Sequence, residues 1–305
     1  MMVENVVIIG SGPAGLSAAL YTAREGFNPI VIAGTDEGGQ LLLTTTVENY
    51  PAFPDGITGP QLIDNMRMQA ERQGARFAHE YVKDVDLTSK PIKVVTDKAT
   101  YLSKSLIIAS GASSKWIGLE SESKFIGRGV SSCATCDGPL FKNKDVIVVG
   151  GGDTAMEDSL FLTGFAKSIT LIHRRNEFKA SRIMQDRLRS NPKIRIILDT
   201  TIDEILGDTR VTSVRIKGVK TGKTEEIKTD GVFIAIGHKP NTEFLNGKLK
   251  LDDGGYIITR NIVETDIDGV YVGGDVADKE YRQAVTAAGT GTMCALKVRH
   301  YLQSH

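Results

Sequence analysis

The chain of 305 residues carries 37 basic and 37 acidic side chains, so its formal net charge is zero. Hydrophobic residues make up 41% of it and charged residues 24%, a composition typical of folded globular proteins rather than of disordered ones. The balanced charge argues against a nucleic-acid-binding or membrane-surface protein, and no apolar run approaches the ~18 residues of a membrane-spanning helix. At about 150 residues per domain, the length suggests two domains.

The amino-terminal residues show no basic segment followed by an apolar one, which predicts neither a secretory signal nor a transit peptide. Three cysteines are too few for a disulfide framework. We therefore expect the protein in a reducing compartment, the cytoplasm.

The opening residues predict a strand, a tight turn and a helix. A β-branched run at 6–9 precedes the glycine turn at 10–15, a small-residue helical pattern covers 16–21, and a second apolar run occupies 29–32. In the pattern Gly10-x-Gly12-x-x-Gly15, the first glycine makes the turn, the second admits a pyrophosphate and the third allows close helix packing. This context favours a dinucleotide site over an ordinary glycine-rich turn.

One feature departs from the usual dinucleotide pattern. The acid expected at the end of the second strand is absent, because Ala33 and Gly34 stand there. Asp36 and Glu37, in the following loop, are the candidates to replace it.

The next segment mixes one helix with two strands. Residues 61–73 predict a helix with Leu62, Met66 and Met68 on its apolar face. Residues 92–96 and 105–109 predict strands.

The strand–turn–helix pattern recurs about 140 residues later. Strands are expected at 145–149 and 169–172, with a helix at 156–161 between them. The turn reads Gly150-x-Gly152-x-x-Ala155, the Ala-ended variant of the fingerprint. We interpret the two copies as two nucleotide-binding units.

His173, Arg174 and Arg175 stand where a ribose-binding acid would follow the second strand of this copy. A guanidinium cannot accept a hydrogen bond from a 2′-hydroxyl but can pair with a 2′-phosphate. The sequence therefore favours NADPH over NADH, with Lys179 as a further cation. A solvated basic strand end is the alternative.

The remaining elements complete the second unit and close the chain. Strands are expected at 194–198, 211–217 and 232–236, with hairpin turns between them. A strand at 269–274 and a helix at 286–301 follow.

Cys133 and Cys136 stand three residues apart, a spacing that allows a small disulfide loop. Zinc is one alternative, although a second ligand pair is missing, and two isolated buried thiols are another. A redox-active dithiol is favoured because two nucleotide fingerprints share the chain with it. Asp137 is then a candidate proton donor to a departing thiolate, while Cys294 lies in an apolar helical segment.

Gly274 and Asp275 end the late strand shortly before the closing helix. An aspartate there can accept hydrogen bonds from a cofactor polyol, and the helix N-terminus can stabilise negative charge on a reduced ring. A simple Gly-Asp turn is the alternative. The five histidines show no metal-pair spacing, so no metal site is predicted.

Taken together, these motifs resemble those of the low-molecular-weight, NADPH-dependent thioredoxin reductases, in the pyridine nucleotide–disulfide oxidoreductase class. The resemblance runs nearly end to end. Its most specific segments are Cys133-Ala134-Thr135-Cys136-Asp137-Gly138 and His173-Arg174-Arg175. Further matching segments are 10–15, 38–41, 47–51, 109–112, 150–153, 235–238 and 274–276.

The resemblance implies an α/β fold with two Rossmann-like dinucleotide-binding domains, each of three layers (ββα). The FAD domain would be discontinuous, comprising residues 1–114 and 244–305. The NADPH domain, 115–243, would be inserted between these parts and carry the dithiol.

It also implies cofactor contacts. Those expected for FAD are Gly10, Gly12, Pro13, Gly15, Gly39, Gln40, Asn49, Gly111, Gly274, Asp275, Arg282, Gln283 and Ala284. Those expected for NADPH are Gly150, Gly152, Asp153, Thr154, His173, Arg174, Arg175, Lys179, Ile236 and Gly237. The family often has Arg where this chain has Lys179, so tolerance of NADH is expected to be higher.

The activity implied is thioredoxin-disulfide reduction, with electrons passing from NADPH through FAD to the Cys133–Cys136 pair and then to oxidised thioredoxin. By resemblance, Cys136 is the sulfur nearer the flavin, Cys133 attacks the substrate disulfide and Asp137 delivers the proton. A large domain rotation would alternate the nicotinamide and the dithiol at the flavin. A homodimer is usual in the family.

Other flavoenzymes of the same build are the nearest alternatives. A reductase of a peroxidase or glutaredoxin-like partner is one, although no thioredoxin-like extension precedes the first strand. A ferredoxin-dependent version is disfavoured by His173-Arg174-Arg175. A non-catalytic flavin-binding or zinc-stabilised protein is the alternative from another class.

Overall fold

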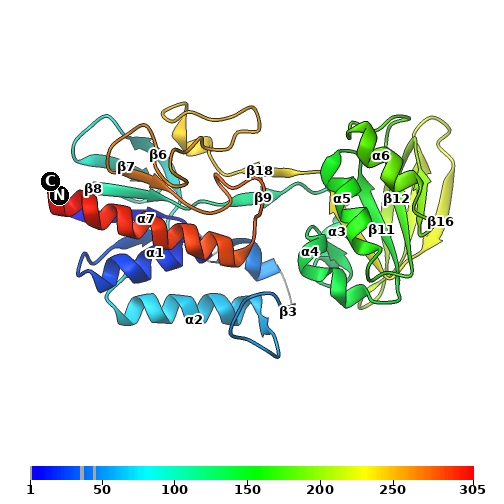
Figure 1. Ribbon diagram of the computed structural model, residues 1–305, viewed down its shortest axis with the longest axis horizontal. Coiled ribbons are helices and arrows are strands. Elements are labelled where there is room, and N and C mark those ends of the chain that lie inside the picture. The colour runs from blue at the N-terminus through cyan, green and yellow to red at the C-terminus, as the bar shows by residue number, and fades with distance from the viewer. Residues whose placement is uncertain (1, 35–37, 44–45) are drawn as a thin grey trace. The chain divides into compact units, whose positions relative to one another are not determined.

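The computed structural model describes residues 2–34, 38–43 and 46–305. The chain divides into two compact units. Unit 1 comprises Met1–Ser113 and Lys239–His305, and unit 2 comprises Ser114–His238. Unit 2 is thus an insertion within unit 1, and each is described by itself below (Figure 1).

A mainly parallel sheet forms the centre of unit 1. Its strand order is β5-β2-β1-β8-β7-β6, with β19 also paired to β8. The strands are β1 (Val3–Ile9), β2 (Ile30–Ile32), β5 (Arg76–Ala78), β6 (Val82–Asp86), β7 (Ile92–Thr96), β8 (Thr100–Ile108) and β19 (Val270–Val272). Strands β5, β2, β1, β8 and β19 are parallel, so their carboxyl ends share one edge.

Helices cover one face of this sheet. They are α1 (Pro13–Arg24), α2 (Gly59–Arg72) and α7 (Ala284–Ser304), with the 3₁₀ turn η1 (Gly39–Leu43). Helix α7 runs beside α1 (Figure 1). The two approach closely because both carry small residues: a Cβ on Gly291 would meet the Ala14 carbonyl oxygen at 2.0 Å.

Two apolar cores sandwich the sheet of unit 1. Val6 and Ile8 of β1 point to the helical side, where Ala18, Ala19 and Val298 pack. The alternate β1 residues Val7 and Ile9 belong to the other core, with Val85, Ile92 and Val94 of the β6–β7 hairpin. Burial on both sides explains the continuous apolar run that predicted this strand.

The predicted apolar face of α2 is wrong at one position. Leu62 is buried and Met66 is half-buried, but Met68 is 45% exposed. Residues four apart lie on the same face of a helix, so Leu62 and Met66 share a face with Ala70, which is fully buried. Met68 lies on a different side of the helix.

Unit 2 has a parallel sheet of order β10-β17-β11-β12-β13 and an antiparallel sheet of order β14-β15-β16. The first comprises β10 (Val130–Ser131), β17 (Gly231–Ala235), β11 (Asp145–Gly150), β12 (Ser168–Ile172) and β13 (Ile194–Ile197). The second comprises β14 (Thr200–Gly207), β15 (Val211–Gly218) and β16 (Thr224–Lys228). The helices are α3 (Glu120–Phe125), α4 (Ala134–Asp137), α5 (Asp153–Leu162) and α6 (Arg182–Arg189), with the 3₁₀ turn η2 (Gly138–Phe141).

Unit 2 is layered as helix, parallel sheet and antiparallel sheet. On one side Val146 and Val148 pack with Met156 of α5 and Leu188 of α6. On the other side Ile147 packs in a core that includes Ile202, Ile205, Val214 and Ile216 of the small sheet. The expectation of an α/β fold with two Rossmann-like domains is confirmed.

Two strands carry the chain between the units. Strand β9 (Ala112–Ser114) and strand β18 (His238–Pro240) pair with each other. The other short elements of unit 1 are β3 (Thr46–Val47), β4 (Ile57–Thr58) and η3 (Glu243–Leu245). No helix within the described ranges is long and apolar enough to cross a membrane.

Every strand and helix expected from the sequence is present; the ends of most are shifted, and those of β7 are as expected. Within the described ranges, the strands and α-helices of five or more residues that were not predicted are β6, β14, β16, α3 and α6.

Candidate functional site

The first glycine turn lies at the carboxyl edge of the parallel strands of unit 1. A Cβ on Gly10 would come 2.2 Å from the Ala109 carbonyl oxygen, and a Cβ on Gly15 would come 1.9 Å from the Gly10 carbonyl oxygen. Gly12 differs, because no atom lies within 4 Å of its Cβ position. It is also the N-cap of α1, with Pro13 next, and no side chain caps the N–H groups of the first helical turn.

Asp275 lies at the same edge, after β19. The neighbouring Gly274 is close to α1, since a Cβ on it would meet the Ala14 Cβ at 2.9 Å. The Oδ1 atom of Asp275 is buried and has no hydrogen-bond partner among the described residues. Burial, helped by nearby Asp278 and opposed by Arg282, raises the pKa of this carboxyl to about 6. A buried acceptor without a partner is rare and indicates a missing donor.

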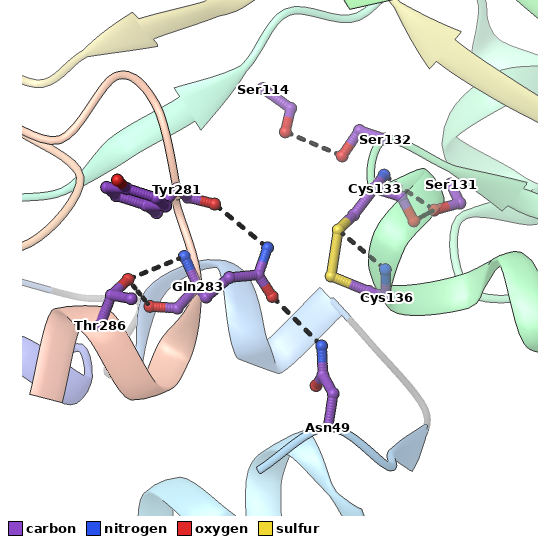
Figure 2. The surroundings of a disulfide bond; sticks show 9 residues. All are labelled: Asn49, Ser114, Ser131, Ser132, Cys133, Cys136, Tyr281, Gln283 and Thr286. Atoms are coloured by element: carbon purple, nitrogen blue, oxygen red, sulfur yellow. Dashed lines mark hydrogen bonds between the residues drawn. A yellow bond between two sulfur atoms is a disulfide. The ribbon is translucent and has the colours of Figure 1, made fainter. Parts of the chain in front are cut away.

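The start of α7 is tied to a distant loop of the same unit. Gln283 is the N-cap of α7 and forms a capping box with Thr286, ahead of Ala284 at the first helical position. Its Oε1 accepts a hydrogen bond of 3.1 Å from the Asn49 amide (Figure 2). The side chains of Asn49 and Gln283, far apart in sequence, are thus brought together.

The other residues predicted to contact FAD are mostly backbone positions. Gly39 and Gly111 have positive φ and no atom within 4 Å of their Cβ positions. Gln40 lies in η1, and Arg282 precedes α7 with a φ of +49°. Asp36 and Glu37 lie outside the described residues.

The second glycine turn, in unit 2, repeats the geometry of the first. A Cβ on Gly150 would meet the Ala235 carbonyl oxygen at 2.3 Å and the Ala155 Cβ at 2.6 Å. Gly152 has nothing within 4 Å of its Cβ position and is the N-cap of α5 without a side-chain cap. Thr154 is in the first turn of this helix.

Three exposed cations follow β12. Arg174, Arg175 and Lys179 are exposed, and none forms an ion pair within the described part of the chain. The Lys179 amide donates to the Gly151 carbonyl at 2.8 Å, which joins this segment to the glycine turn. The arrangement offers an unneutralised positive cluster beside an open helix N-terminus.

Two of the residues predicted to contact NADPH, His173 and Asp153, form side-chain hydrogen bonds within unit 2. His173 is buried, and its Nε2 lies 3.1 Å from the Glu177 carbonyl oxygen. The Asp153 carboxylate accepts hydrogen bonds from the Ser181 N–H and hydroxyl at 2.9 and 2.8 Å, which lower its pKa.

The last two predicted NADPH contacts follow β17. Ile236 is 39% exposed, and Gly237 has a positive φ with open space at its Cβ position.

Cys133 and Cys136 form a disulfide around the short helix α4, with Cα atoms 5.3 Å apart. Cys133 is the N-cap, and its Sγ lies 3.2 Å from the Cys136 N–H donor nitrogen (Figure 2). The structure therefore joins the two sulfurs to each other rather than holding them as separate thiols. Within the described residues, no group of three or more His, Cys, Asp or Glu side chains is placed to bind a metal.

Asp137 ends the same helix and is largely buried. Its N–H donates to the Cys133 carbonyl at 3.1 Å. Burial raises the pKa of the carboxyl, and a hydrogen bond from Ser131 opposes the rise. A carboxyl with a raised pKa beside a disulfide suits proton transfer.

Comparison with known proteins places this geometry in a family. The family model described as pyridine nucleotide-disulphide oxidoreductase matches residues 4–291. The thioredoxin reductase of Rickettsia typhi is 52% identical over 303 residues, 98% of each chain. That of Streptomyces clavuligerus is 50% identical over 304 residues, covering 98% of this chain and 94% of the relative.

Among solved structures, the thioredoxin reductase from Streptococcus pyogenes has a TM-score of 0.95 at 40% identity, covering 99% of each chain. That from Giardia duodenalis has a TM-score of 0.93 at 40% identity, covering 98% of each chain. The chain belongs to the thioredoxin reductase family.

Membership makes this thioredoxin reductase family protein an oxidoreductase that uses a flavin and a nicotinamide cofactor. The residues present fit both groups. Asp275 supplies a buried acceptor that lacks a donor, and Gly12 and Gly152 each leave open a space that a Cβ would fill. The two uncapped helix N-termini suit the pyrophosphate of a dinucleotide.

Sequence reasoning missed three serines that organise these sites. Ser11 accepts from the Gly38 N–H and donates to the Ala33 carbonyl; Ser181 donates to the Asp153 carboxylate; Ser131 accepts from the Cys133 N–H. A serine hydroxyl often accepts a hydrogen bond from the N–H two residues later in a turn, so the sequence could have predicted the Ser131–Cys133 contact. Ser11 and Ser181 contact residues 27 and 28 positions away, so no short sequence pattern predicts those contacts.

Proposed function

We propose that this protein reduces the disulfide of oxidised thioredoxin with electrons from NADPH, using FAD as the flavin and Cys133–Cys136 as the redox pair. The disulfide observed in unit 2, which also holds the second glycine turn, carries the proposal. When bound, the flavin supplies the two-electron relay between nicotinamide and disulfide.

The NADPH-binding domain is proposed to be residues 115–243. Its glycine turn at 150–155 would hold the pyrophosphate at the N-terminus of α5. Arg174 and Arg175 would pair with the 2′-phosphate, and Lys179 would add a third positive charge. The absence of ion pairs at these exposed cations supports this role, since they are not already neutralised by described residues.

The FAD-binding domain is proposed to be residues 1–114 and 244–305. Gly10, Gly12 and Gly15 would admit the pyrophosphate, and Asp275 would accept hydrogen bonds from hydroxyl groups of the cofactor. The unpartnered Oδ1 of Asp275 supports that role. The Asn49–Gln283 pair would border the flavin near the start of α7, whose positive end stabilises negative charge.

The disulfide chemistry is proposed to divide between the two sulfurs. Breaking the S–S bond takes two electrons and leaves two thiolates. The Asp137 carboxyl gives its proton to one of them, and Cys133 remains as the nucleophile that attacks the substrate disulfide. Cys136 then closes on Cys133, which releases the reduced substrate and restores the disulfide.

Alternating access follows from the connectivity. The disulfide and the glycine turn proposed to hold NADPH share unit 2, while the residues proposed to bind FAD are in unit 1. Because both must reach one flavin, unit 2 would rotate about the paired strands β9 and β18. A cross-link that fixes the two units in one orientation is expected to stop turnover, and full activity in such a variant would contradict rotation.

A homodimer in the cytoplasm is proposed from the family resemblance. Size-exclusion chromatography with light scattering tests the oligomer directly.

The decisive assay is reduction of insulin through added thioredoxin, with NADPH consumption followed by absorbance. Wild-type protein is expected to be yellow and active, and Cys133→Ser and Cys136→Ser are each expected to be inactive while NADPH still bleaches the flavin. Cys294→Ala, at a buried cysteine of α7, is the matched control and keeps its turnover. Full thioredoxin turnover in either serine variant would overturn the proposal.

A further inference from the structure

The short segment that joins β19 to Asp275 is in close contact with helices α1 and α7 of unit 1. A Cβ on Gly274 would come 2.9 Å from the Cβ of Ala14, in α1. A Cβ on Gly273 would come 3.2 Å from the carbonyl carbon of Thr290, in α7. Both glycines are buried, so the backbone itself packs against the two helices.

The backbone N–H of Gly274 is satisfied by a side chain of α7. It donates a hydrogen bond of 2.9 Å to Oγ1 of Thr290. The Thr290 hydroxyl lies 3.0 Å from the Ala287 carbonyl oxygen and 3.2 Å from the Thr286 carbonyl oxygen of its own helix. A hydroxyl has one hydrogen and two lone pairs, so it donates to these helix carbonyls and accepts from Gly274.

The peptide groups on both sides of Gly274 are therefore held. Its N–H is bonded to Thr290, and its carbonyl oxygen accepts hydrogen bonds of 3.0 and 3.1 Å from the N–H groups of Ala277 and Asp278. Between these two peptide groups, a φ of +79° at Gly274 turns the chain. Asp275 follows directly, so the same hydrogen bonds direct its backbone and, with it, the carboxyl.

The buried Oδ1 of Asp275 has no hydrogen-bond partner in the described part of the chain, and the proposed function gives it a hydroxyl group of FAD as donor. Such a bond weakens steeply when its two atoms move apart or out of line. We propose that Thr290 is a positioning residue, whose hydroxyl holds the Gly274 turn so that the Asp275 carboxyl is in place before FAD binds. This inference rests on the proposed binding of FAD by unit 1.

Loss of the hydroxyl alone tests this role. Valine has nearly the shape of threonine but no side-chain oxygen, so Thr290→Val leaves the N–H of the buried Gly274 without its acceptor. An unpaired buried N–H is costly, so the turn is expected to shift and to move Asp275 with it. Thr290→Ser retains the hydroxyl and is expected to retain the bond.

The first measurement is FAD binding to the flavin-free, full-length protein, followed by quenching of flavin fluorescence. Thr290→Val is expected to raise the Kd for FAD about tenfold, the effect of one lost hydrogen bond at a buried N–H, and Thr290→Ser less than about twofold. Thr292→Val is the matched control, because the Thr292 hydroxyl donates to the Ala288 carbonyl of the same helix, at 3.1 Å. It keeps the wild-type Kd. A wild-type Kd in Thr290→Val would overturn the proposal.

A double-mutant cycle with Asp275→Ala separates positioning from a general loosening of α7. In the Asp275→Ala background, Thr290→Val is expected to add less than about twofold to the Kd, because the hydroxyl acts through the missing carboxyl. If Thr290→Val weakens FAD binding as much in this background as in the wild type, Thr290 does not act through Asp275 and the positioning role is wrong.

Hydrogen exchange at the Gly274 amide, measured by NMR on the flavin-free protein, tests the contact itself. The amide is expected to exchange about tenfold faster in Thr290→Val than in the wild type or Thr290→Ser, and equal exchange would refute the contact. If the valine variant does not fold, Thr290→Ser and Thr290→Ala carry all three measurements, since they differ only in the hydroxyl. Wild-type protein that binds no FAD would refute the proposed function itself.

Discussion

The imidazole of His173 packs against the backbone of Gly151, in the middle of the second glycine turn. A Cβ on Gly151 would lie 2.2 Å from the ring, and the ring is held by the Glu177 carbonyl and by Phe178, whose centroid is 5.3 Å away. His173 therefore supports the turn from within unit 2. The predicted NADPH-binding segment contains one structural residue, His173, followed by two exposed cations.

Adjacent glycines of this turn are expected to respond differently to a methyl group. Gly151→Ala must displace the His173 ring, so it is expected to lower the free energy of unfolding by about 1–3 kcal/mol. Gly152→Ala has open space and an extended backbone, so stability is expected to stay within about 0.5 kcal/mol while NADPH affinity falls. Urea unfolding and NADPH titration of both variants measure this, and equal loss of stability would contradict it.

His173 is expected to make stability depend on pH. Burial lowers its pKa below the usual value of 6.5, and Arg175 and Arg174 lower it further. The unfolded chain then binds more protons, so stability is full above the unfolded pKa and falls as pH drops below it. His173→Gln is expected to flatten the fall of Tm between pH 7 and 5. The exposed His300 provides the control variant, and an unchanged slope in His173→Gln would refute this account.

Removal of Arg174 and Arg175 tests the choice between the two nicotinamide cofactors. Their replacement by Ala is expected to raise the KM for NADPH about 10²–10⁴-fold, because each arginine contributes one charge-assisted hydrogen bond of ~1.5–3 kcal/mol. The KM for NADH should change much less, because NADH lacks the 2′-phosphate. Arg187→Ala, on the exposed side of α6, is the control. Equal losses with both cofactors would eliminate 2′-phosphate recognition as the role.

Asp275→Asn is expected to have opposite effects on stability and on flavin binding. The pKa is raised from 3.8 to about 6, so the folded flavin-free protein loses stability as pH rises through that value. The asparagine variant should therefore be more stable at pH 8 by up to roughly 3 kcal/mol, with no gain at pH 4. Its FAD affinity should fall about tenfold, because the acceptor is no longer charged.

Urea unfolding of the flavin-free protein at the two pH values and FAD fluorescence titration measure these effects. The exposed Asp253→Asn serves as control. A stability gain that does not depend on pH would show that the buried charge is not its source.

Apolar runs in the sequence located the parallel strands because those strands are buried on both faces. Strand β7 was predicted with both ends correct, since the run at 92–96 is bounded by polar turn residues. Helix α6 was missed because four of its eight residues are charged, leaving Leu188 as its one fully buried side chain. Strand β14 was interpreted as part of hairpin turns, because threonine and acidic residues interrupt its apolar positions.

Sequence motifs identified the glycine turns and the cysteine pair because the constraints there are local. A Cβ at Gly10 or Gly150 meets a carbonyl that the neighbouring parallel strand places, so the turn itself carries the signal. The hydrogen bonds between Asn49 and Gln283 and between Ser181 and Asp153 depend on tertiary packing. No spacing along the chain encodes those contacts.

Thiol counting during anaerobic reduction tests the central claim most directly. Protein reduced with NADPH is alkylated under native conditions and mapped by mass spectrometry, with Cys294 as the buried internal control. We expect two new thiols per chain, at Cys133 and Cys136, formed at the expense of one NADPH. If the pair stays oxidised while NADPH is consumed and the flavin is bleached, electrons do not pass through this disulfide and the account is contradicted.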